Sequence, residues 1–330
     1  MTSIREIFAK FNQLNVLIVG DVMIDRYIHG RVSRISPEAP VPIVELRSTE
    51  NRLGGAGNVA LNIKALGATP YLFSVIGDDT EGSNLLQLLT QNDLPTNGIL
   101  QSSERKTSVK TRIMAGTQQM LRVDDEMTAD LTTEQAGNFI KKLRNFLNIN
   151  TIHVIIFQDY NKGVLSLDII KAVMDEAQKR HIPTAVDPKK NNFLAYKNAT
   201  LFKPNLKEIR EAVSFEVTPD LASLQRATDY LRNEMNQHYT MITLSEKGLF
   251  LAADTEGSHI YPTVARNIAD VSGAGDTVVS VAALGLALGV DARTLALLSN
   301  LAGGQVCEIS GIVPVNKGQL LREFEKMGDG

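Results

Sequence analysis

Between about residues 130 and 260, the sequence alternates between short apolar runs and longer amphipathic stretches. The apolar runs predict strands at 154–157, 184–186, 200–202 and 241–244. The amphipathic stretches predict helices at 132–147, 166–180, from 206 onward, and 221–235. Strands that alternate with helices form a mostly parallel sheet with helices on both faces. We therefore expect an α/β fold, and a single domain over residues 1–330, because no linker-like segment interrupts the chain.

Charge and composition exclude several classes of partner and location. The formal net charge is −3 and there is no long basic block, which argues against nucleic acid or an anionic membrane as the main partner. The single cysteine, Cys307, suits a reducing compartment and is expected to be buried. The N-terminus lacks the apolar core of a signal peptide, and the apolar stretch 278–290 is shorter than the roughly 20 residues that span a bilayer. We expect a cytoplasmic protein.

A glycine-rich stretch in the last quarter of the chain has the features of an anion-binding helix start. Gly273 and Gly275 precede Asp276, and a proline-free apolar run begins at Thr277. This run has the length of a buried helix, so the glycines should lie at its N-terminus. Free N–H groups and the positive end of the helix dipole would attract an anion there.

Asp276 would then be a carboxylate beside a bound anion. In phosphoryl transfer, a carboxylate in this place accepts the proton of the attacking hydroxyl while the N–H groups hold the phosphate. Asp is also a favoured helix cap, so an ordinary helix start is the alternative interpretation of this stretch.

Two carboxylates near the N-terminus indicate a place for sugar hydroxyls. Asp21 and Asp25 follow a predicted strand at 15–20, and ligands bind at the carboxyl ends of strands in open α/β sheets. Structural roles in turns and caps are the alternative for both. Further along the chain, Gly55 and Asn58 would bring backbone and an amide close to the same sugar.

The glycines at 55–60 also fit the dinucleotide-binding pattern G-x-G-x-x-A. That interpretation requires a strand directly before the glycines. We expect no strand there, because the polar run 47–52 intervenes, and we therefore disfavour a nicotinamide cofactor.

Two segments outside the predicted sheet are expected to form a small β lid, inserted at about 26–50 and 106–124. Its expected strands are at 27–32, 41–46, 106–114 and 119–123. A lid sheet has free edges and an apolar face, and it therefore invites pairing with a second copy. We expect a homodimer formed through the lid.

Polar residues gather where four predicted strands end. They are Asp159, Asn161 and Lys162, then Asp187, Lys189 and Lys190, then 203–208, and finally 243–248. Because the carboxyl ends of parallel strands meet at one edge of a sheet, these four clusters predict a ligand site at that edge.

The two glycine-rich stretches resemble the two signatures of one enzyme family. Residues 270–277, Asp-Val-Ser-Gly-Ala-Gly-Asp-Thr, resemble the signature D-T-x-G-A-G-D of the ribokinase-like (PfkB) carbohydrate kinases, with Val271 where Thr is common. Gly54, Gly55, Asn58 and Ala60 resemble the second signature, G-G-x-x-x-N-x-A. The resemblance covers essentially the whole chain. It implies a ribokinase-like fold and an ATP-dependent sugar kinase that uses Mg²⁺.

Six further segments look like one subgroup, the kinase part of the ADP-heptose synthesis proteins. They are 20–27, 33–42, 118–124, 159–163, 187–189 and 203–205. This resemblance implies phosphorylation of D-glycero-β-D-manno-heptose 7-phosphate at its anomeric C1 hydroxyl, which gives the 1,7-bisphosphate. The product would serve as a precursor of the lipopolysaccharide core.

The resemblance, carried over residue by residue, also implies roles within the site. It makes Asp276 the general base and the backbone of Gly273, Ala274 and Gly275 the anion hole. The residues implied to contact ATP and its Mg²⁺ are Asn205, Glu208, Ser245, Gly248, Asn300 and Gly304. Glu208 would act on the metal directly or through water, since Mg²⁺ takes few protein ligands. The residues expected to hold the sugar are Asp21, Asp25, Gly55, Asn58, Asp159 and Asp187.

The 7-phosphate of such a substrate requires a cationic partner. The candidates are Arg34, Arg122, Lys162 and Lys189, and the sequence does not rank them.

Many members of this subgroup continue into a nucleotidyltransferase part with an H-x-G-H motif, which does not occur before Gly330. We expect a separate nucleotidyltransferase to act on the product. Two alternatives stay open, another PfkB sugar or nucleoside kinase of the ribokinase or fructokinase type, and a catalytically silent sugar- or nucleotide-binding protein.

Overall fold

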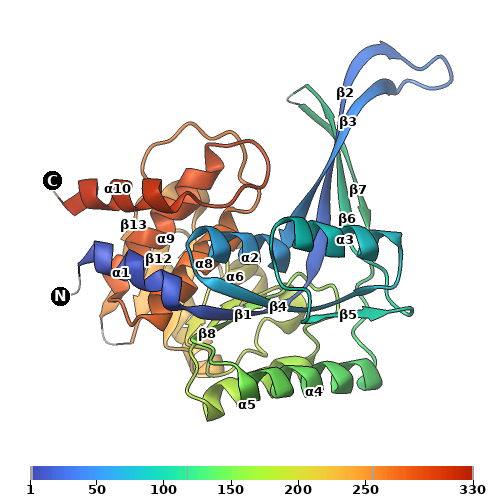
Figure 1. The fold of residues 1–330 in the computed structure, drawn as a ribbon. Helices are drawn as coiled ribbons and strands as arrows, with labels where there is room; N and C mark the ends of the chain where they lie inside the picture. Colours follow the sequence, from blue (N-terminus) through green and yellow to red (C-terminus); the bar gives the residue numbers. More distant parts are fainter. Residues whose placement is uncertain (1–2, 117, 255, 329–330) are drawn as a thin grey trace.

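The computed structural model describes residues 3–116, 118–254 and 256–328, and a central sheet of nine strands runs through this part of the chain (Figure 1). Listed from one edge to the other, its strands are β13 (Gly257–Tyr261), β12 (Leu249–Ala253), β11 (Tyr239–Thr243), β10 (Leu201–Phe202), β9 (Thr184–Asp187), β8 (Val154–Gln158), β1 (Asn15–Gly20), β4 (Thr69–Gly77) and β5 (Ile99–Ser102). Neighbours are parallel except β11 with β12 and β12 with β13. The predicted mostly parallel sheet is confirmed, whereas the edge strand β5 was not foreseen.

Helices cover both faces of this sheet. On one face lie α1 (Ile4–Lys10), α2 (Ala56–Ala65), α3 (Thr80–Gln91), α8 (Ala274–Ala287), α9 (Ala292–Cys307) and α10 (Lys317–Gly328). On the other lie α4 (Thr133–Ile149), α5 (Leu167–Lys179), α6 (Leu206–Ala212) and α7 (Leu221–Met235). Short 3-10 turns occur at Phe11–Gln13, Lys190–Asn192 and Ser245–Lys247. Among the described helices, none combines the length and apolar character needed to cross a membrane.

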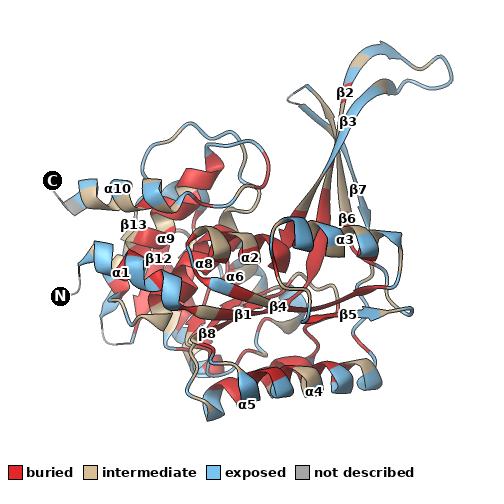
Figure 2. Ribbon diagram, viewed as in Figure 1, coloured by how far each residue is buried: buried red, intermediate tan, exposed pale blue. Residues whose placement is uncertain are grey.

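The apolar core is divided by the sheet into two clusters (Figure 2). In β1, Val16 and Ile18 belong to the cluster under α8, whereas Leu17 and Val19 belong to the cluster under α4 and α5. Successive side chains of a strand point to opposite faces, so a strand covered on both faces must be apolar throughout. This explains why the central strands are continuous apolar runs in the sequence.

Helix α8 is buried around its whole circumference. Its residues from Asp276 to Gly285 are all buried, and it contacts α2, α9, β8 and β9. A helix that is apolar on every side is stable only in such an interior position. The core therefore fixes the N-terminus of α8 close to the central strands.

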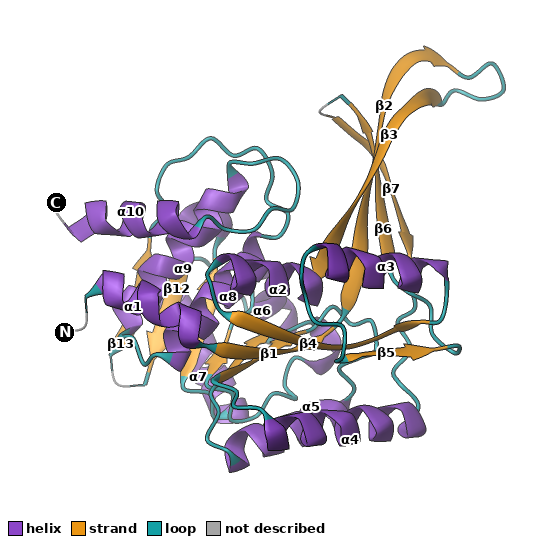
Figure 3. Cartoon of the chain, viewed as in Figure 1, coloured by secondary structure: helices purple, strands orange, loops and turns teal. Residues whose placement is uncertain are grey.

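A second sheet of four strands rises from the body of the molecule as a lid (Figure 3). Its strands are β3 (Pro42–Gly55), β2 (Val22–Ile35), β6 (Val109–Ala115) and β7 (Gln118–Asp125), in that order. Strand β2 begins five residues before the expected strand 27–32 and ends three residues after it, and β3 continues nine residues beyond the expected strand 41–46. Cys307 is buried, as predicted.

One expectation about the lid was wrong. The polar run 47–52 does not separate the glycines from a strand, because β3 continues through it to Gly55. Most of β3 is exposed, so no apolar alternation marks it in the sequence. The dinucleotide-binding arrangement is nevertheless absent from the described residues, since β3 pairs antiparallel with β2 in the lid and not within a parallel βαβ unit.

Candidate active site

Asp276 lies in the first turn of α8, and three neutral donors hold its carboxylate. Asn58 Nδ2 donates to Oδ2 at 2.7 Å. Gln158 Nε2 and the Tyr160 hydroxyl donate to Oδ1 at 2.9 and 2.8 Å. These donors come from α2, from the end of β8 and from the loop after β8. Three separate segments therefore fix the orientation of one carboxylate that is only 3% exposed.

The surroundings of this carboxylate shift its proton affinity. Burial raises the pKa of Asp276 to about 6, the hydrogen bond from Asn58 opposes the rise, and the Asp187 carboxylate adds to it. Such a group is ionised at neutral pH and is a stronger base than an ordinary Asp. The geometry thus presents an oriented and basic carboxylate.

The backbone before Asp276 makes a tight turn that only glycine accommodates well. Gly273 has φ +80° and directly precedes α8. A Cβ on Gly273 would lie 2.8 Å from Asn58 Nδ2, the donor that holds the carboxylate. Gly273, Ala274 and Gly275 are half-buried. The first N–H groups of a helix have no partner within the helix and can bind an anion. Of the three residues assigned to the anion hole, Ala274 already donates its N–H to the Val271 carbonyl oxygen at 3.3 Å.

A buried ion pair lies beside this helix start. Lys203 Nζ and Asp187 Oδ2 are 3.1 Å apart, and the two side chains are 3% and 7% exposed. A Cβ on Gly275 would be 3.7 Å from both atoms, so the pair borders the first turn of α8. Lys203 therefore adds a positive charge next to the helix dipole, where a phosphate would collect.

Asp25 and the glycines of β3 meet at the base of the lid. Asp25 is 2% exposed and forms an ion pair with Arg112 of β6. A Cβ on Gly54 would lie 2.0 Å from Asp25 Oδ2, and one on Gly55 would lie 2.4 Å from the Asp21 carbonyl oxygen. Side chains are excluded at both glycines, because the Asp25 carboxylate and the Asp21 backbone occupy the space that a Cβ would need.

Asp21 and Asp159 are engaged with the loop after β8. The Asp21 carboxylate accepts hydrogen bonds from the backbone N–H groups of Tyr160, Lys162 and Val164 at 2.9 to 3.1 Å. Burial, with the charge of Asp159, raises the pKa of Asp21 to about 6. Asp159 accepts from the Asn161 backbone N–H and the Tyr196 hydroxyl, both at 2.8 Å. Both carboxylates thereby hold the loop that carries Tyr160.

Asn205 and Glu208 form the N-terminal cap of α6. Asn205 Oδ1 accepts from the Glu208 N–H at 2.9 Å, and Glu208 Oε2 accepts from the Asn205 N–H at 2.8 Å. Lys189 completes this group through an ion pair with Glu208. In the described residues, no three His, Cys, Asp or Glu side chains converge as a metal site. Mg²⁺ usually keeps several waters and binds only one or two carboxylates, so Glu208 alone could supply the carboxylate that it needs.

The four residues assigned to the nucleotide border the segment that leads from β13 to α8. Ser245 and Gly248 lie in the turn between β11 and β12. Asn300 Nδ2 donates to the Pro262 carbonyl oxygen at 2.8 Å. A Cβ on Gly304 would lie 2.8 Å from Arg266 Nε. The structure thus brings Gly248 and two residues of α9 to the chain segment that precedes α8.

The four cations predicted to hold a sugar phosphate lie in different surroundings. Arg34 is exposed on the outer part of β2, and Arg122 is exposed on β7, with Asp124 2.9 Å away. Lys162 pairs with Glu126, and both side chains are largely buried. Lys189 pairs with Glu208. Lys189 Nζ also lies 5.4 Å from the centroid of the Tyr160 ring, whose hydroxyl donates to Asp276.

Several side chains that shape the site were not among the residues predicted to line it. They are Gln158, Tyr160 and Arg112, whereas Lys203 was predicted only as part of the polar cluster 203–208. Tyr160 and Lys203 lie inside the segments 159–163 and 203–205, which resemble the heptose kinases. This resemblance could have identified both residues as members of the site. Gln158 ends an apolar strand, and a single polar residue in that place has no distinctive pattern.

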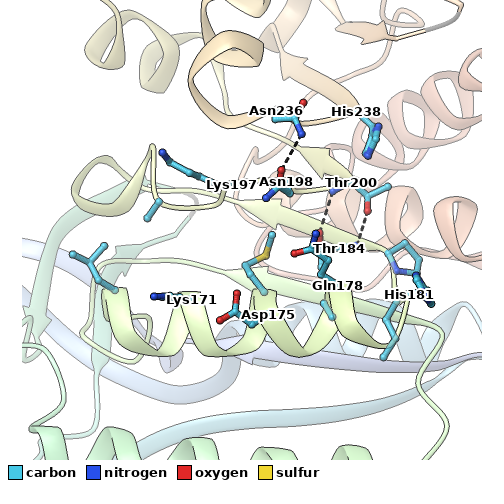
Figure 4. Close-up of a pocket in the computed structure, with 16 residues that line it drawn as sticks. Lys171, Asp175, Gln178, His181, Thr184, Lys197, Asn198, Thr200, Asn236 and His238 are labelled. Carbon is cyan, nitrogen blue, oxygen red and sulfur yellow. Dashed lines mark hydrogen bonds between the residues drawn. The ribbon is translucent and has the colours of Figure 1, made fainter.

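Among the cavities outside the carboxylate cluster are two that are lined by several polar side chains. One, of about 150 Å³, separates the lid from the loop before α10 and is lined by Tyr27, Arg52, Arg112 and Asp270 among others. The other, of about 770 Å³, is lined by Thr184, Thr200 and His238 at the amino ends of their strands (Figure 4). Ligands of open α/β sheets bind at the carboxyl ends, so the larger pocket lies at the wrong end of the sheet for the candidate chemistry.

Comparison with known proteins places this geometry in a family context. The pfkB family carbohydrate kinase model matches residues 13–316. The chain is 40% identical over 304 residues to the Bifunctional protein HldE of Pelobacter propionicus, covering 92% of this chain and 61% of that protein. It is 39% identical over 322 residues to the HldE of Granulibacter bethesdensis, covering 96% and 66%. The chain thus spans roughly three fifths to two thirds of the length of these curated relatives.

Solved structures share the fold at low sequence identity. Phosphofructokinase-2 of Escherichia coli in complex with potassium superimposes with a TM-score of 0.78 at 19% identity, covering 96% of this chain and 99% of that one. Ribokinase of Arabidopsis thaliana, complexed with ribose and ATP, superimposes with a TM-score of 0.72 at 14% identity, covering 94% and 98%. These similarities establish the ribokinase-like fold.

Proposed function

The chain belongs to the pfkB family of carbohydrate kinases, and from this premise we propose that it phosphorylates D-glycero-β-D-manno-heptose 7-phosphate at the anomeric hydroxyl, with ATP as donor. The observation that carries the reaction type is the carboxylate of Asp276. It lies at the N-terminus of α8, beside the buried cation of Lys203, and three neutral donors orient it. The choice of sugar rests on the segments that resemble the heptose kinases.

In the proposed reaction the anomeric hydroxyl donates its proton to Asp276. The hydroxyl oxygen forms a bond to the γ-phosphorus of ATP, and the bond from that phosphorus to the bridging oxygen breaks, which releases ADP. The first-turn N–H groups of α8 and Lys203 stabilise the charge on the transferred group. Asn58 is the only side chain donor to Asp276 Oδ2 among the described residues, which leaves a lone pair there for the substrate hydroxyl.

Mg²⁺ would neutralise charge on the ATP phosphates when it is bound. Glu208 and Asn205 are the residues we assign to it, with water between Glu208 and the metal. The ion pair of Glu208 with Lys189 holds this carboxylate close to the loop after β9.

We assign the sugar to the space at the base of the lid. Asp25, the backbone at Gly55, and Asn58 would contact its hydroxyl groups. Asp21 and Asp159 would act by holding the loop of Tyr160, since their oxygens already accept hydrogen bonds from that loop and from Tyr196. The proposed location is the cytoplasm, which suits a chain whose single cysteine, Cys307, is a buried free thiol.

The lid also suggests a homodimer. Its exposed apolar side chains are Ile35, Val41, Leu46, Leu121 and Val123, each about half or more exposed. Exposed apolar groups on a sheet with free edges favour association with a complementary surface. We propose that a second copy of the chain covers this lid surface.

The test of the proposed function is ADP release with Mg-ATP across a panel of acceptors. The panel contains heptose 7-phosphate, fructose 6-phosphate, fructose, ribose and adenosine. Selective turnover of the heptose phosphate supports the proposal. Turnover of ribose or fructose in its place would keep Asp276 as the base and reject the heptose. If no acceptor of the five leads to ADP release while ATP still binds, the result would favour a binding protein.

A further inference from the structure

One face of the lid carries a row of cationic side chains. Paired residues of neighbouring strands share a face, and β2 pairs Asp25 with Lys110 and with Arg52 in its two neighbours. Two residues further along β2, Tyr27 is opposite Arg112 of β6, and Arg112 is opposite Arg122 of β7. Side chains two residues apart share a face, so Arg52, Lys110, Arg112 and Arg122 all lie on the face of Asp25.

Three of these four cations are neutralised within the lid. Arg52 Nε lies 2.6 Å from Glu50 Oε1, and Arg122 Nε lies 2.9 Å from Asp124 Oδ1. Arg112 forms its ion pair with Asp25. Lys110 is different, because no carboxylate of the described residues lies within 4.0 Å of its Nζ and this atom donates no hydrogen bond there.

The acids around Lys110 already have other partners. The carboxylates whose charge acts on it are Asp25, Glu126 and Asp124. They pair with Arg112, Lys162 and Arg122, respectively. Burial lowers the pKa of Lys110, with the charge of Lys162 acting in the same direction. A half-buried ammonium without a counterion is costly, and a bound anion would offset that cost.

Lys110 also lies close to the reacting end of the site. Its Nζ is 5.2 Å from the centroid of the Tyr160 ring, and the hydroxyl of that ring donates to Asp276 at 2.8 Å. Lys189 Nζ lies 5.4 Å from the same centroid. A single aromatic ring therefore separates the uncompensated cation from the base. A sugar whose hydroxyl meets Asp276 can present its other end to Lys110.

We propose that Lys110 binds the phosphate of a phosphorylated sugar and selects such sugars over unphosphorylated ones, with Lys162 as a second contact. The proposal rests on the proposed kinase function and names a residue that the four sequence candidates did not include. Among those candidates, Arg34 and Arg122 are exposed and Lys189 is committed to Glu208. Lys162 lies near Lys110, and its charge is shared with Glu126.

The experiment compares wild-type protein with Lys110→Met, which keeps a long apolar stem and removes the charge. Lys106→Met is the matched control, because Lys106 is exposed near the same strand and pairs with Asp125. We measure KM and kcat for heptose 7-phosphate and for the corresponding unphosphorylated heptose. Loss of a charge-assisted hydrogen bond predicts a rise of roughly 10- to 100-fold in KM for the phosphorylated sugar. KM for ATP and the parameters for the unphosphorylated sugar should change less than twofold.

Inorganic phosphate supplies a readout that does not need turnover. In calorimetry it should bind wild-type protein and Lys106→Met, and heptose 7-phosphate should displace it, while binding to Lys110→Met should weaken by about tenfold or more. Equal affinity in all three proteins for both probes, or no binding of either, would overturn the role of Lys110. If wild-type protein turned over only unphosphorylated acceptors, the proposed function would fail on its own, and the calorimetry would still decide the role of Lys110.

Discussion

At the scale of single residues, the site is organised around the protonation state of Asp276. The carboxylate is nearly inaccessible, and its partners Asn58, Gln158 and Tyr160 are all neutral. Neutral donors orient a carboxylate without lowering its basicity as much as a cation would. The cation of Lys203 is paired with Asp187 and lies beside the helix start. Asp276 therefore stays basic, and the positive charge of Lys203 lies where phosphate would bind.

The first prediction concerns the role of Asp276 as a base. Asp276→Asn keeps the size and most hydrogen bonds of the side chain but cannot accept a proton. We expect kcat to fall by about 10²–10⁴-fold, because general base catalysis contributes that much. The dissociation constant of ATP, measured by calorimetry, should stay within about threefold. A variant whose kcat is within twofold of wild type would reject the assignment.

The second prediction is a pH dependence. The pKa of Asp276 is raised to about 6 by burial, so the ionised base is lost as the pH falls through 6. We expect kcat/KM to be level between about pH 7 and 8 and to decline about tenfold per pH unit well below 6, since kcat/KM reports the free enzyme. The residual activity of Asp276→Asn should be level over the same range. A wild-type profile that stays level down to pH 4.5 would contradict the perturbed pKa.

Among the elements of the fold, α8 has a glycine before it and another after it, and the two differ in what a side chain there would contact. Gly273 before the helix and Gly289 after it both have positive φ, +80° and +63°. A Cβ on Gly289 would meet nothing within 4 Å, whereas one on Gly273 would press on the Asn58 amide. Only the first glycine therefore couples backbone conformation to the carboxylate of Asp276.

The third prediction uses this pair as a matched comparison. Gly289→Ala should lower the free energy of unfolding by about 1–2 kcal/mol through strain in the left-handed region alone, with kcat unchanged. Gly273→Ala should show the same strain and also displace Asn58, so kcat should fall at least tenfold. Denaturant unfolding and steady-state kinetics on both variants check this. Equal kcat in the two variants would show that Asn58 does not transmit the change.

In the whole molecule, the two faces of the lid differ in the side chains that they carry. Leu121 and Val123 alternate along β7 with Arg122, so they point away from the cationic face. One face of the lid thus looks toward the carboxylate of Asp276, and the other leaves apolar side chains in contact with solvent. Covering that second face with another copy would restrain the lid over the site.

The fourth prediction tests this association. Wild-type protein should have twice the chain mass of 36.1 kDa in light scattering coupled to gel filtration. Leu121→Lys should shift it toward the monomer, because a buried ammonium without a partner is costly. Ile149→Lys is the control, since Ile149 is 83% exposed at the end of α4, away from the lid strands. A monomeric wild type, or a Leu121→Lys protein that stays dimeric, would exclude the lid interface.

The class of fold could be predicted from the residue pattern alone, because the strands covered on both faces, such as β1 and β8, must be apolar throughout and the helices between them must be amphipathic. The glycine-rich start of α8 could be predicted as well, since the turn at Gly273 depends on a local backbone conformation that glycine marks in any context. The exposed lid strand β3 was missed for the opposite reason, as exposure removes the alternation that would have revealed it.

The pairing of the functional side chains depends on contacts between distant parts of the chain. Asn58 and Asp276 are 218 residues apart in the chain, and Tyr160 and Asp276 are 116 apart, yet each pair shares a hydrogen bond. Lys110 stands out only because the acids around it pair with other cations. The pKa of a side chain and the balance of charge around it depend on the groups that surround it in space. These groups come together only when the central sheet, α8 and the lid are folded.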